Sequence, residues 1–107
     1  MRILMTNWVY LPEFSGAALQ CHRLSRALQR QGVQINVLTG THERGMAGPD
    51  RIDDIPVHRV LRDVSSPIGQ IRYFRAMQSF IRQHWRLFDI VHTHGFHPRV
   101  NMLVSKI

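Results

Sequence analysis

The chain has 107 residues, of which 44% are hydrophobic and 20% are charged, a balance typical of one globular domain rather than a disordered chain. Its single cysteine, Cys21, excludes an internal disulfide, and no apolar run approaches the roughly 20 residues that a membrane-spanning helix needs. A reducing compartment is the simpler assumption, so we expect a cytoplasmic protein.

The formal net charge of +7 favours anionic partners. Nucleic acid, a phosphorylated small molecule and an anionic membrane face all fit this charge, and arginines on an ordinary solvated face explain it equally well. Nucleic acid is disfavoured, because the chain shows neither a recognition-helix pattern nor aromatic residues interleaved with the basic ones.

The first third of the chain predicts a strand, a helix and a second strand. Residues 2–6 are a short apolar run typical of a buried parallel strand, and a second strand is expected at 33–39. Between them Ser15 is suited to be the N-cap of a helix, and Gly32 stands where a helix ends in a left-handed residue. The predicted buried stripe of this helix comprises Ala17, Cys21, Leu24 and Leu28. A strand–helix–strand unit of this length implies parallel pairing.

The middle of the chain predicts a loop, a strand and a basic helix. Residues 40–54 carry glycine, proline and acidic residues without periodicity and predict a loop, whereas a third strand is expected near 56–61. Ser66 and Pro67 open a helix. Its predicted apolar stripe comprises Ile71, Phe74, Met77, Ile81 and Trp85, and the arginines of another side are Arg72, Arg75, Arg82 and Arg86. This basic side is either solvated or docks on an anionic surface such as a membrane.

The end of the chain predicts a fourth strand near 88–93 and a helix over 98–107. That helix reaches Ile107 without a glycine or a capping segment, so we expect the chain to be the front part of a longer protein. The predicted fold class is α/β, with a Rossmann-like parallel sheet of about four strands flanked by helices.

Three histidines follow the fourth predicted strand, in the run Asp89-Ile-Val-His-Thr-His-Gly-Phe-His-Pro98. His92 and His94 share one face of the strand, beside the strand ends where open α/β sheets bind ligands. A metal bound by His92, His94 and His97 is one interpretation, although no carboxylate lies within the motif to complete the site. A structural role for a buried histidine is another. The third is a polar group presented to a substrate, by His94 in particular.

The turn after the first strand is the other candidate site. A glycine before a helix N-terminus lets the backbone approach a ligand, and free N–H groups there favour an anion. Gly16 is followed by Ala17 and Ala18, but the three-glycine dinucleotide fingerprint and the lysine-containing P-loop are both absent. The turn therefore serves either tight packing or ligand contact.

Five segments carry a resemblance to a known family. They are Met1-Arg-Ile-Leu-Met5, Pro12-Glu-Phe-Ser-Gly-Ala-Ala18, His22-Arg-Leu-Ser-Arg-Ala-Leu28, Gln31-Gly-Val-Gln-Ile-Asn-Val-Leu-Thr39 and Phe88-Asp-Ile-Val-His-Thr-His-Gly95. In this order they resemble the start of family 4 glycosyltransferases of the GT-B fold, which have a glycine–glycine turn, an Arg-Gly-His-Glu-Val type segment and an Asp-Val-Val-His-x-His strand. The resemblance covers essentially the whole chain.

The resemblance implies that residues 1–107 are part of the N-terminal, acceptor-side domain of an enzyme whose C-terminal domain holds the nucleotide-sugar. It implies that Ser15, Gly16 and Ala17 approach the donor phosphates and the acceptor, and that His94 contacts the transferred sugar at the catalytic centre. Ser15 departs from the family's glycine pair. No metal and no cofactor beyond the nucleotide-sugar donor are implied.

We therefore predict a glycosyltransferase N-terminal domain that takes part in hexose transfer to a glycan, lipid or small-molecule acceptor. The chain alone, without the donor-binding domain, is expected to be inactive, and the protein is expected in the cytoplasm or at the inner face of a membrane. Two alternatives stay open. One is a metal-dependent hydrolase that uses the His92-Thr93-His94 motif, and the other is a non-catalytic Rossmann-like binding module.

Overall fold

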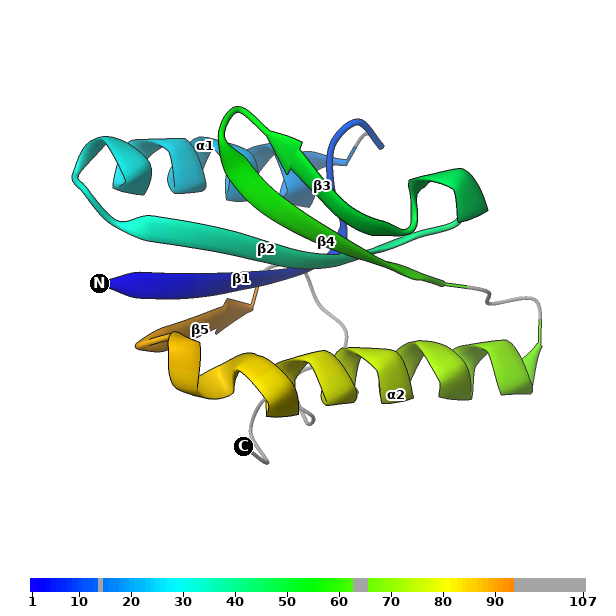
Figure 1. Cartoon of the computed structure of the whole chain (residues 1–107). Helices are drawn as coiled ribbons and strands as arrows, with labels where there is room; N and C mark the ends of the chain where they lie inside the picture. The colour runs from blue at the N-terminus through cyan, green and yellow to red at the C-terminus, as the bar shows by residue number, and fades with distance from the viewer. Residues whose placement is uncertain (14, 63–65, 94–107) are drawn as a thin grey trace.

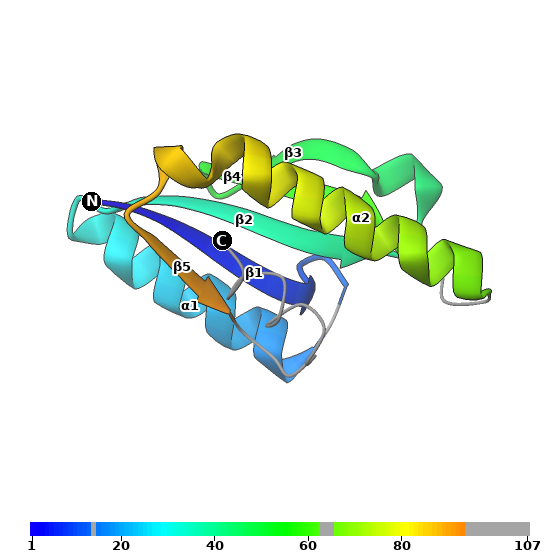
Figure 2. The same cartoon turned by 90° about the horizontal axis from the view of Figure 1, so that it is seen from below.

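The computed structural model describes residues 1–13, 15–62 and 66–93, which form one five-stranded sheet with a helix on each face (Figure 1). The strands are β1 (Arg2–Val9), β2 (Gln34–Thr41), β3 (Gly48–Ile52), β4 (Ile55–Leu61) and β5 (Ile90–Thr93), and their order in the sheet is β3-β4-β2-β1-β5. The α-helices are α1 (Gly16–Arg30) and α2 (Pro67–His84), and two 3-10 turns are η1 (Arg44–Met46) and η2 (Trp85–Leu87). Figures 1 and 2 show α2 running alongside the strands, on the sheet face away from α1. The predicted α/β class is confirmed.

The unit β1–α1–β2 is parallel, as predicted, and the predicted ends of its helix are confirmed. The Ser15 Oγ accepts the Ala18 N–H at 2.9 Å, so this hydroxyl caps α1. Gly32 follows the last turn at φ 86°, a left-handed conformation that costs little without a Cβ. β1 extends to Val9, beyond the predicted end at residue 6.

The buried face of α1 differs from the predicted stripe. Its buried residues are Ala18, Cys21, His22 and Ser25. Leu24 is 37% exposed, and Ala17 and Leu28 are half-buried. Ser25 can be buried because its hydroxyl donates to the Cys21 carbonyl at 2.7 Å, so the hydroxyl has a hydrogen-bond partner inside the protein. The prediction was wrong here because it assigned only apolar side chains to the inner face.

The buried face of α2 is also rotated from the predicted stripe. Met77 and Ile81 are buried as predicted, and they are joined by Tyr73 one turn earlier. Ile71 and Trp85 are 52% and 43% exposed, which contradicts their assignment to the core. The four-residue spacing from Tyr73 to Ile81 keeps a narrow row against the sheet, and Trp85 lies beyond the end of the helix in η2.

The sheet contains one strand that the sequence did not predict. β3 lies within the segment 40–54, which was interpreted as a loop, and it pairs antiparallel with β4, so the sheet is mixed. β3 is an edge strand with exposed residues along most of its length, so it shows no hydrophobic alternation. Asp53 and Asp54 form the connecting turn at φ 49° and 64°. The helix predicted over 98–107 lies outside the described residues.

Two apolar clusters fill the faces of the sheet. Ile3 and Met5 of β1 belong to the cluster under α1, whereas Leu4 belongs to the cluster under α2. This division follows the period-two alternation of side chains along a strand. Both faces are therefore packed, as expected for strands buried between two layers of helix.

The order of the strands in the sheet reverses between β1 and β5, because β2 and β4 lie on one side of β1 and β5 lies on the other. From β1 the chain passes over α1 to β2 on one side, and from β4 it passes over α2 to β5 on the other side (Figure 1). β5 pairs in parallel with β1, with Thr93 opposite Thr6. In open α/β sheets ligands bind outside the carboxyl ends of the strands at such a reversal. This edge is the place to look for the site.

Candidate functional site

The loop from β1 to α1 places the first predicted site residues at the carboxyl edge of the sheet. Ser15 is half-buried and its hydroxyl is engaged in capping α1, whereas Gly16 is the exposed first residue of that helix. A Cβ built on Gly16 has nothing within 4 Å, and the residue has no left-handed backbone. The fold therefore does not require glycine at this position, although a closely bound ligand would.

Of the three histidines after the fourth predicted strand, the structure describes only His92. His92 lies on β5 opposite Met5, next to β1, and it is exposed, so it is not the buried histidine of the structural interpretation. His94 and His97 lie outside the described residues. Within the parts of the chain that the structure covers, no three histidine, cysteine or acidic side chains gather as a metal site would require.

Arg62, just after β4, fixes the end of β1. Its guanidinium donates to the carbonyl oxygen of Trp8 and lies over the Trp8 ring, 4.2 Å from the ring centroid. A second Arg62 nitrogen lies 2.8 Å from Nε2 of His42, and the Arg62 carbonyl accepts from Nδ1 of His42 at 3.1 Å. Because arginine only donates, His42 carries its proton on Nδ1 here. Burial lowers the pKa of Arg62 below its usual range.

Arg59, on β4, fixes the loop that follows. Only 2% of this residue is exposed, and its guanidinium donates to the Leu11 carbonyl and to the Asp50 carboxylate, both at 2.5 Å. The N–H of Arg51 first, and then Arg59, lower the pKa of Asp50 below its usual range. A buried cation thus joins β4 to β3 and to the loop from β1.

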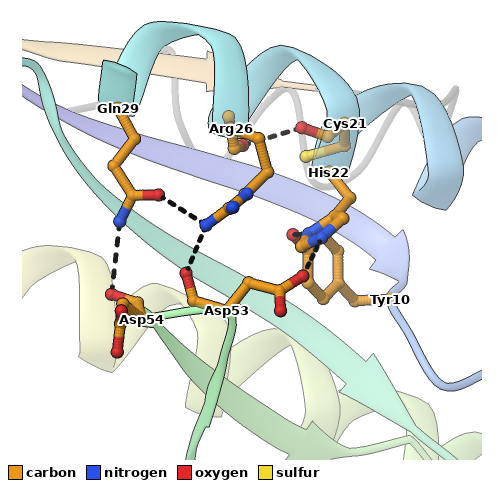
Figure 3. Close-up of polar contacts among 8 residues, drawn as sticks. Tyr10, Cys21, His22, Arg26, Gln29, Asp53 and Asp54 are labelled. Atoms are coloured by element: carbon orange, nitrogen blue, oxygen red, sulfur yellow. Dashed lines mark hydrogen bonds and ion pairs between the residues drawn. The ribbon is translucent and has the colours of Figure 1, made fainter. Parts of the chain in front are cut away.

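A third contact joins the same loop to α1 and to the β3–β4 turn (Figure 3). The hydroxyl of Tyr10 lies 2.6 Å from Nδ1 of His22, and Nε2 of His22 lies 2.8 Å from the Asp53 carboxylate. With an ionised Asp53 as acceptor, Nε2–H donates to Asp53 and the Tyr10 hydroxyl donates to Nδ1. Burial raises the pKa of Tyr10 above its usual range, so the phenol keeps its proton.

The β3–β4 turn is itself held against α1. Arg26 donates to the Asp53 carbonyl at 3.0 Å and Gln29 donates to the Asp54 carbonyl at 3.5 Å (Figure 3). The Glu13 carboxylate accepts from the Thr41 hydroxyl at 2.6 Å, which adds a contact between the described part of the β1–α1 loop and β2.

Cys21 is not suited to be a nucleophile. It is fully buried on α1, and burial raises the pKa of its thiol to about 11. Near neutral pH the group stays a thiol, which neither attacks substrates nor binds metals well.

Sequence reasoning missed the residues that position the loop. Arg59 follows Ile55 and Val57 on the same face of β4, so a cation sits on an apolar strand face. That anomaly was visible in the sequence and is typical of a paired buried charge. Asp53 and His22 carried no such signal. They are far apart in the chain, and they come into contact because Asp53 lies in the turn between β3 and β4.

The comparison with protein families decides the identity of this fold. The model of the glycosyl transferase 4-like domain matches residues 15–105. The chain belongs to the glycosyl transferase 4-like family. No curated protein matches the chain. The predicted resemblance to family 4 glycosyltransferases is thereby confirmed, and the α/β fold described above is that of a glycosyltransferase domain.

Membership of the glycosyl transferase 4-like family assigns sugar transfer as the general activity, with a sugar donor and an acceptor as substrates. In the described part of this glycosyltransferase domain, no helix combines the length and the apolar character needed to cross a bilayer.

Proposed function

We propose that this domain forms the acceptor side of a nucleotide-sugar-dependent glycosyltransferase, with the reacting sugar in the crevice between the carboxyl ends of β1 and β5. The topological reversal between these two strands carries the proposal. The loop from β1 leads to Ser15 and Gly16, and β5 leads directly into His94. Both predicted site segments therefore leave neighbouring strands at the same edge.

In this proposal the domain acts by positioning and electrostatics. The bond from the sugar to the diphosphate breaks, a bond to the acceptor oxygen forms, and the proton of the acceptor hydroxyl passes to the leaving diphosphate. The exposed N-terminus of α1 at Gly16 favours the negative charge that develops on the leaving diphosphate, and the short side chain of Ala17 adds little bulk beside it. His94 hydrogen-bonds the transferred sugar. No metal or cofactor is needed for these roles.

Gly16→Ala tests the site, because the fold leaves room for the new methyl group. We expect the variant to keep the stability of the wild type while binding of sugar ligands, followed by NMR, weakens. Gln20→Ala, an exposed change one turn further along α1, is the matched control and should leave binding unchanged. Unchanged binding by Gly16→Ala would place the ligand elsewhere.

The isolated chain is expected to have no transferase activity. The proposal assigns the donor nucleotide to a second domain, and these 107 residues show no dinucleotide fingerprint or P-loop of their own. A radiolabelled sugar-transfer assay on the purified chain should give background counts. Turnover above background would contradict this part of the proposal.

One surface of α2 supports a second role, docking on an anionic membrane. Ile68 and Ile71 are 64% and 52% exposed, on the helix face opposite the buried Met77. Arg72, Arg75 and Arg82 fall on the same exposed face at helical spacing. Apolar and basic side chains together suit the headgroup region of an anionic bilayer.

Vesicle sedimentation tests this second role. Each basic residue near an anionic bilayer contributes about 1 kcal/mol, so replacing Arg75 and Arg82 with glutamine should weaken binding by roughly 30-fold. Arg23→Gln with Arg30→Gln, two exposed changes on α1, is the control of equal charge. Binding that ignores the anionic lipid content of the vesicles removes the role.

A further inference from the structure

A cavity of about 270 Å³ opens beside the carboxyl end of β4, two strands away from β1. Its lining residues are Arg44 of η1, Val60 and Leu61 of β4, and Gly69, Arg72 and Ala76 of α2. Small-molecule sites span about 300–1,000 Å³, so this space suits one functional group of a larger ligand.

Two arginines from separate elements line this space. Arg44 comes from the turn after β2, and Arg72 comes from the second turn of α2. No hydrogen bond or ion pair joins either side chain to another residue in the described ranges, and none of the lining residues is acidic. Among the described residues 1–13, 15–62 and 66–93, no side chain of the cavity wall therefore neutralises this positive charge.

The N-terminus of α2 adds to the positive electrostatic potential of the cavity. The first turn of α2 carries no acidic residue, and its N-terminus has a partial positive charge. Ser66 caps the helix by accepting the Gly69 N–H at 3.0 Å, so the arginines rather than backbone groups are the available donors. Planar guanidinium groups match the oxygens of a phosphate and bind it through paired hydrogen bonds.

We propose that Arg44 and Arg72 bind a phosphate group, which is carried by the sugar acceptor if the proposed function holds. Val60 and Leu61 form an apolar floor, against which the part of the ligand next to the phosphate packs. The phosphate belongs either to a soluble phosphate ester or to a lipid headgroup, since both present the same oxygens to the two arginines.

Calorimetric titration with inorganic phosphate at constant ionic strength tests the site. Arg44→Gln and Arg72→Gln should each weaken binding about tenfold or more, because a charge-assisted hydrogen bond is lost. Arg23→Gln, an exposed change on α1 outside the cavity, should bind like the wild type, and circular dichroism checks that all variants fold. Absence of saturable binding, or equal weakening by Arg23→Gln, overturns the proposal.

Two further titrations identify the source of the phosphate. Saturable binding of glycerol 3-phosphate that depends on Arg44 supports a soluble ester. Arg44-dependent binding only to vesicles of phosphatidylcholine and phosphatidylglycerol supports a headgroup. Binding of both without dependence on Arg44 overturns the site. If Gly16→Ala leaves sugar binding unchanged while phosphate binding depends on Arg44, the proposed function fails and this site stands.

Discussion

Arg62 and Trp8 are joined twice, because the guanidinium donates to the Trp8 carbonyl and also lies over the indole ring. The contact links the residue after β4 to the end of β1, which are 54 positions apart in the chain. The contact therefore fixes the end of β1, the strand that precedes the candidate site at Ser15–Ala17.

Arg62→Met should destabilise the domain by roughly 2–4 kcal/mol, because the partly buried Trp8 carbonyl and His42 lose a charged donor. Urea unfolding followed by tryptophan fluorescence measures the change. Arg23→Met, at an exposed position of α1, should stay within about 0.5 kcal/mol of the wild type. Equal effects of the two changes would mean that the Arg62 contacts add nothing.

Gly40→Ala should destabilise the domain by roughly 1–3 kcal/mol, the usual cost of overpacking. The new Cβ would lie 3.1 Å from the Trp8 carbonyl oxygen, and equally close to side-chain atoms of Arg62 and Tyr73. Gly16→Ala is the matched glycine change with free space around it, and its unfolding midpoint should equal or exceed that of the wild type. A Gly40→Ala variant as stable as Gly16→Ala would contradict the packing described here.

Asp54→Gly should stabilise the domain by about 0.5–1 kcal/mol, because Asp54 adopts φ 64° and only glycine does so at no steric cost. Asp53→Gly relieves a similar backbone conformation but removes the carboxylate that pairs with His22. It should therefore be no more stable than the wild type. Thermal melts of the two variants compare them, and a gain of the same size in both would show that the His22 contact does not stabilise the fold.

His58 should make the stability fall as the solution is acidified. Burial first, and then the charge of the nearby His84, lower the pKa of His58 below its ordinary value of 6.5. The unfolded chain therefore takes up a proton at higher pH than the folded domain does, so stability decreases as pH falls from 6.5 toward the folded pKa.

Replacing His58 with phenylalanine tests whether this histidine makes the stability fall as the pH is lowered. The change keeps an aromatic ring against Phe80, whose centroid lies 4.7 Å from that of His58. Between about pH 7.5 and pH 5, urea unfolding should show the wild type losing stability relative to His58→Phe. Parallel curves for the two proteins would contradict the pKa shift.

The thiol of Cys21 should react slowly with iodoacetamide at pH 8 in the folded domain. The group is buried and its pKa is raised to about 11, so little thiolate forms. Denaturant should restore rapid alkylation, and mass spectrometry follows both rates. Fast modification of the native protein would show that α1 does not shield this residue.

Local signals in the sequence predicted the helix ends well. Ser15, Gly32 and Ser66 all act as predicted, because caps depend on residues only a few positions apart. The buried faces were harder, since Ser25 and Tyr73 enter the interior through contacts that a hydrophobic pattern does not encode. Helix propensity and hydrophobic periodicity predict that a helix forms, but they do not fix which of its faces is turned toward the sheet.

The antiparallel strand β3 and the contacts around it could not be predicted from local pattern. β3 buries little and is held by backbone pairing and by the bridge from Arg59 to Asp50, which depends on tertiary structure. The pairing of His22 with Asp53 exists only once the β3–β4 turn lies against α1. The sequence predicts a candidate site at Ser15–Ala17 and His94, and it did not predict the residues that hold the described part of the loop before Ser15.

NMR mapping of ligand binding tests the central claim most directly. UDP-glucose and a set of sugar phosphates are titrated into the ¹⁵N-labelled chain, and amide shifts are followed to saturation. The account predicts shifts concentrated at Ser15–Ala18 and at Thr93, at the carboxyl ends of β1 and β5. Shifts confined to the opposite edge of the sheet, around Arg2 and Gln34, would contradict it.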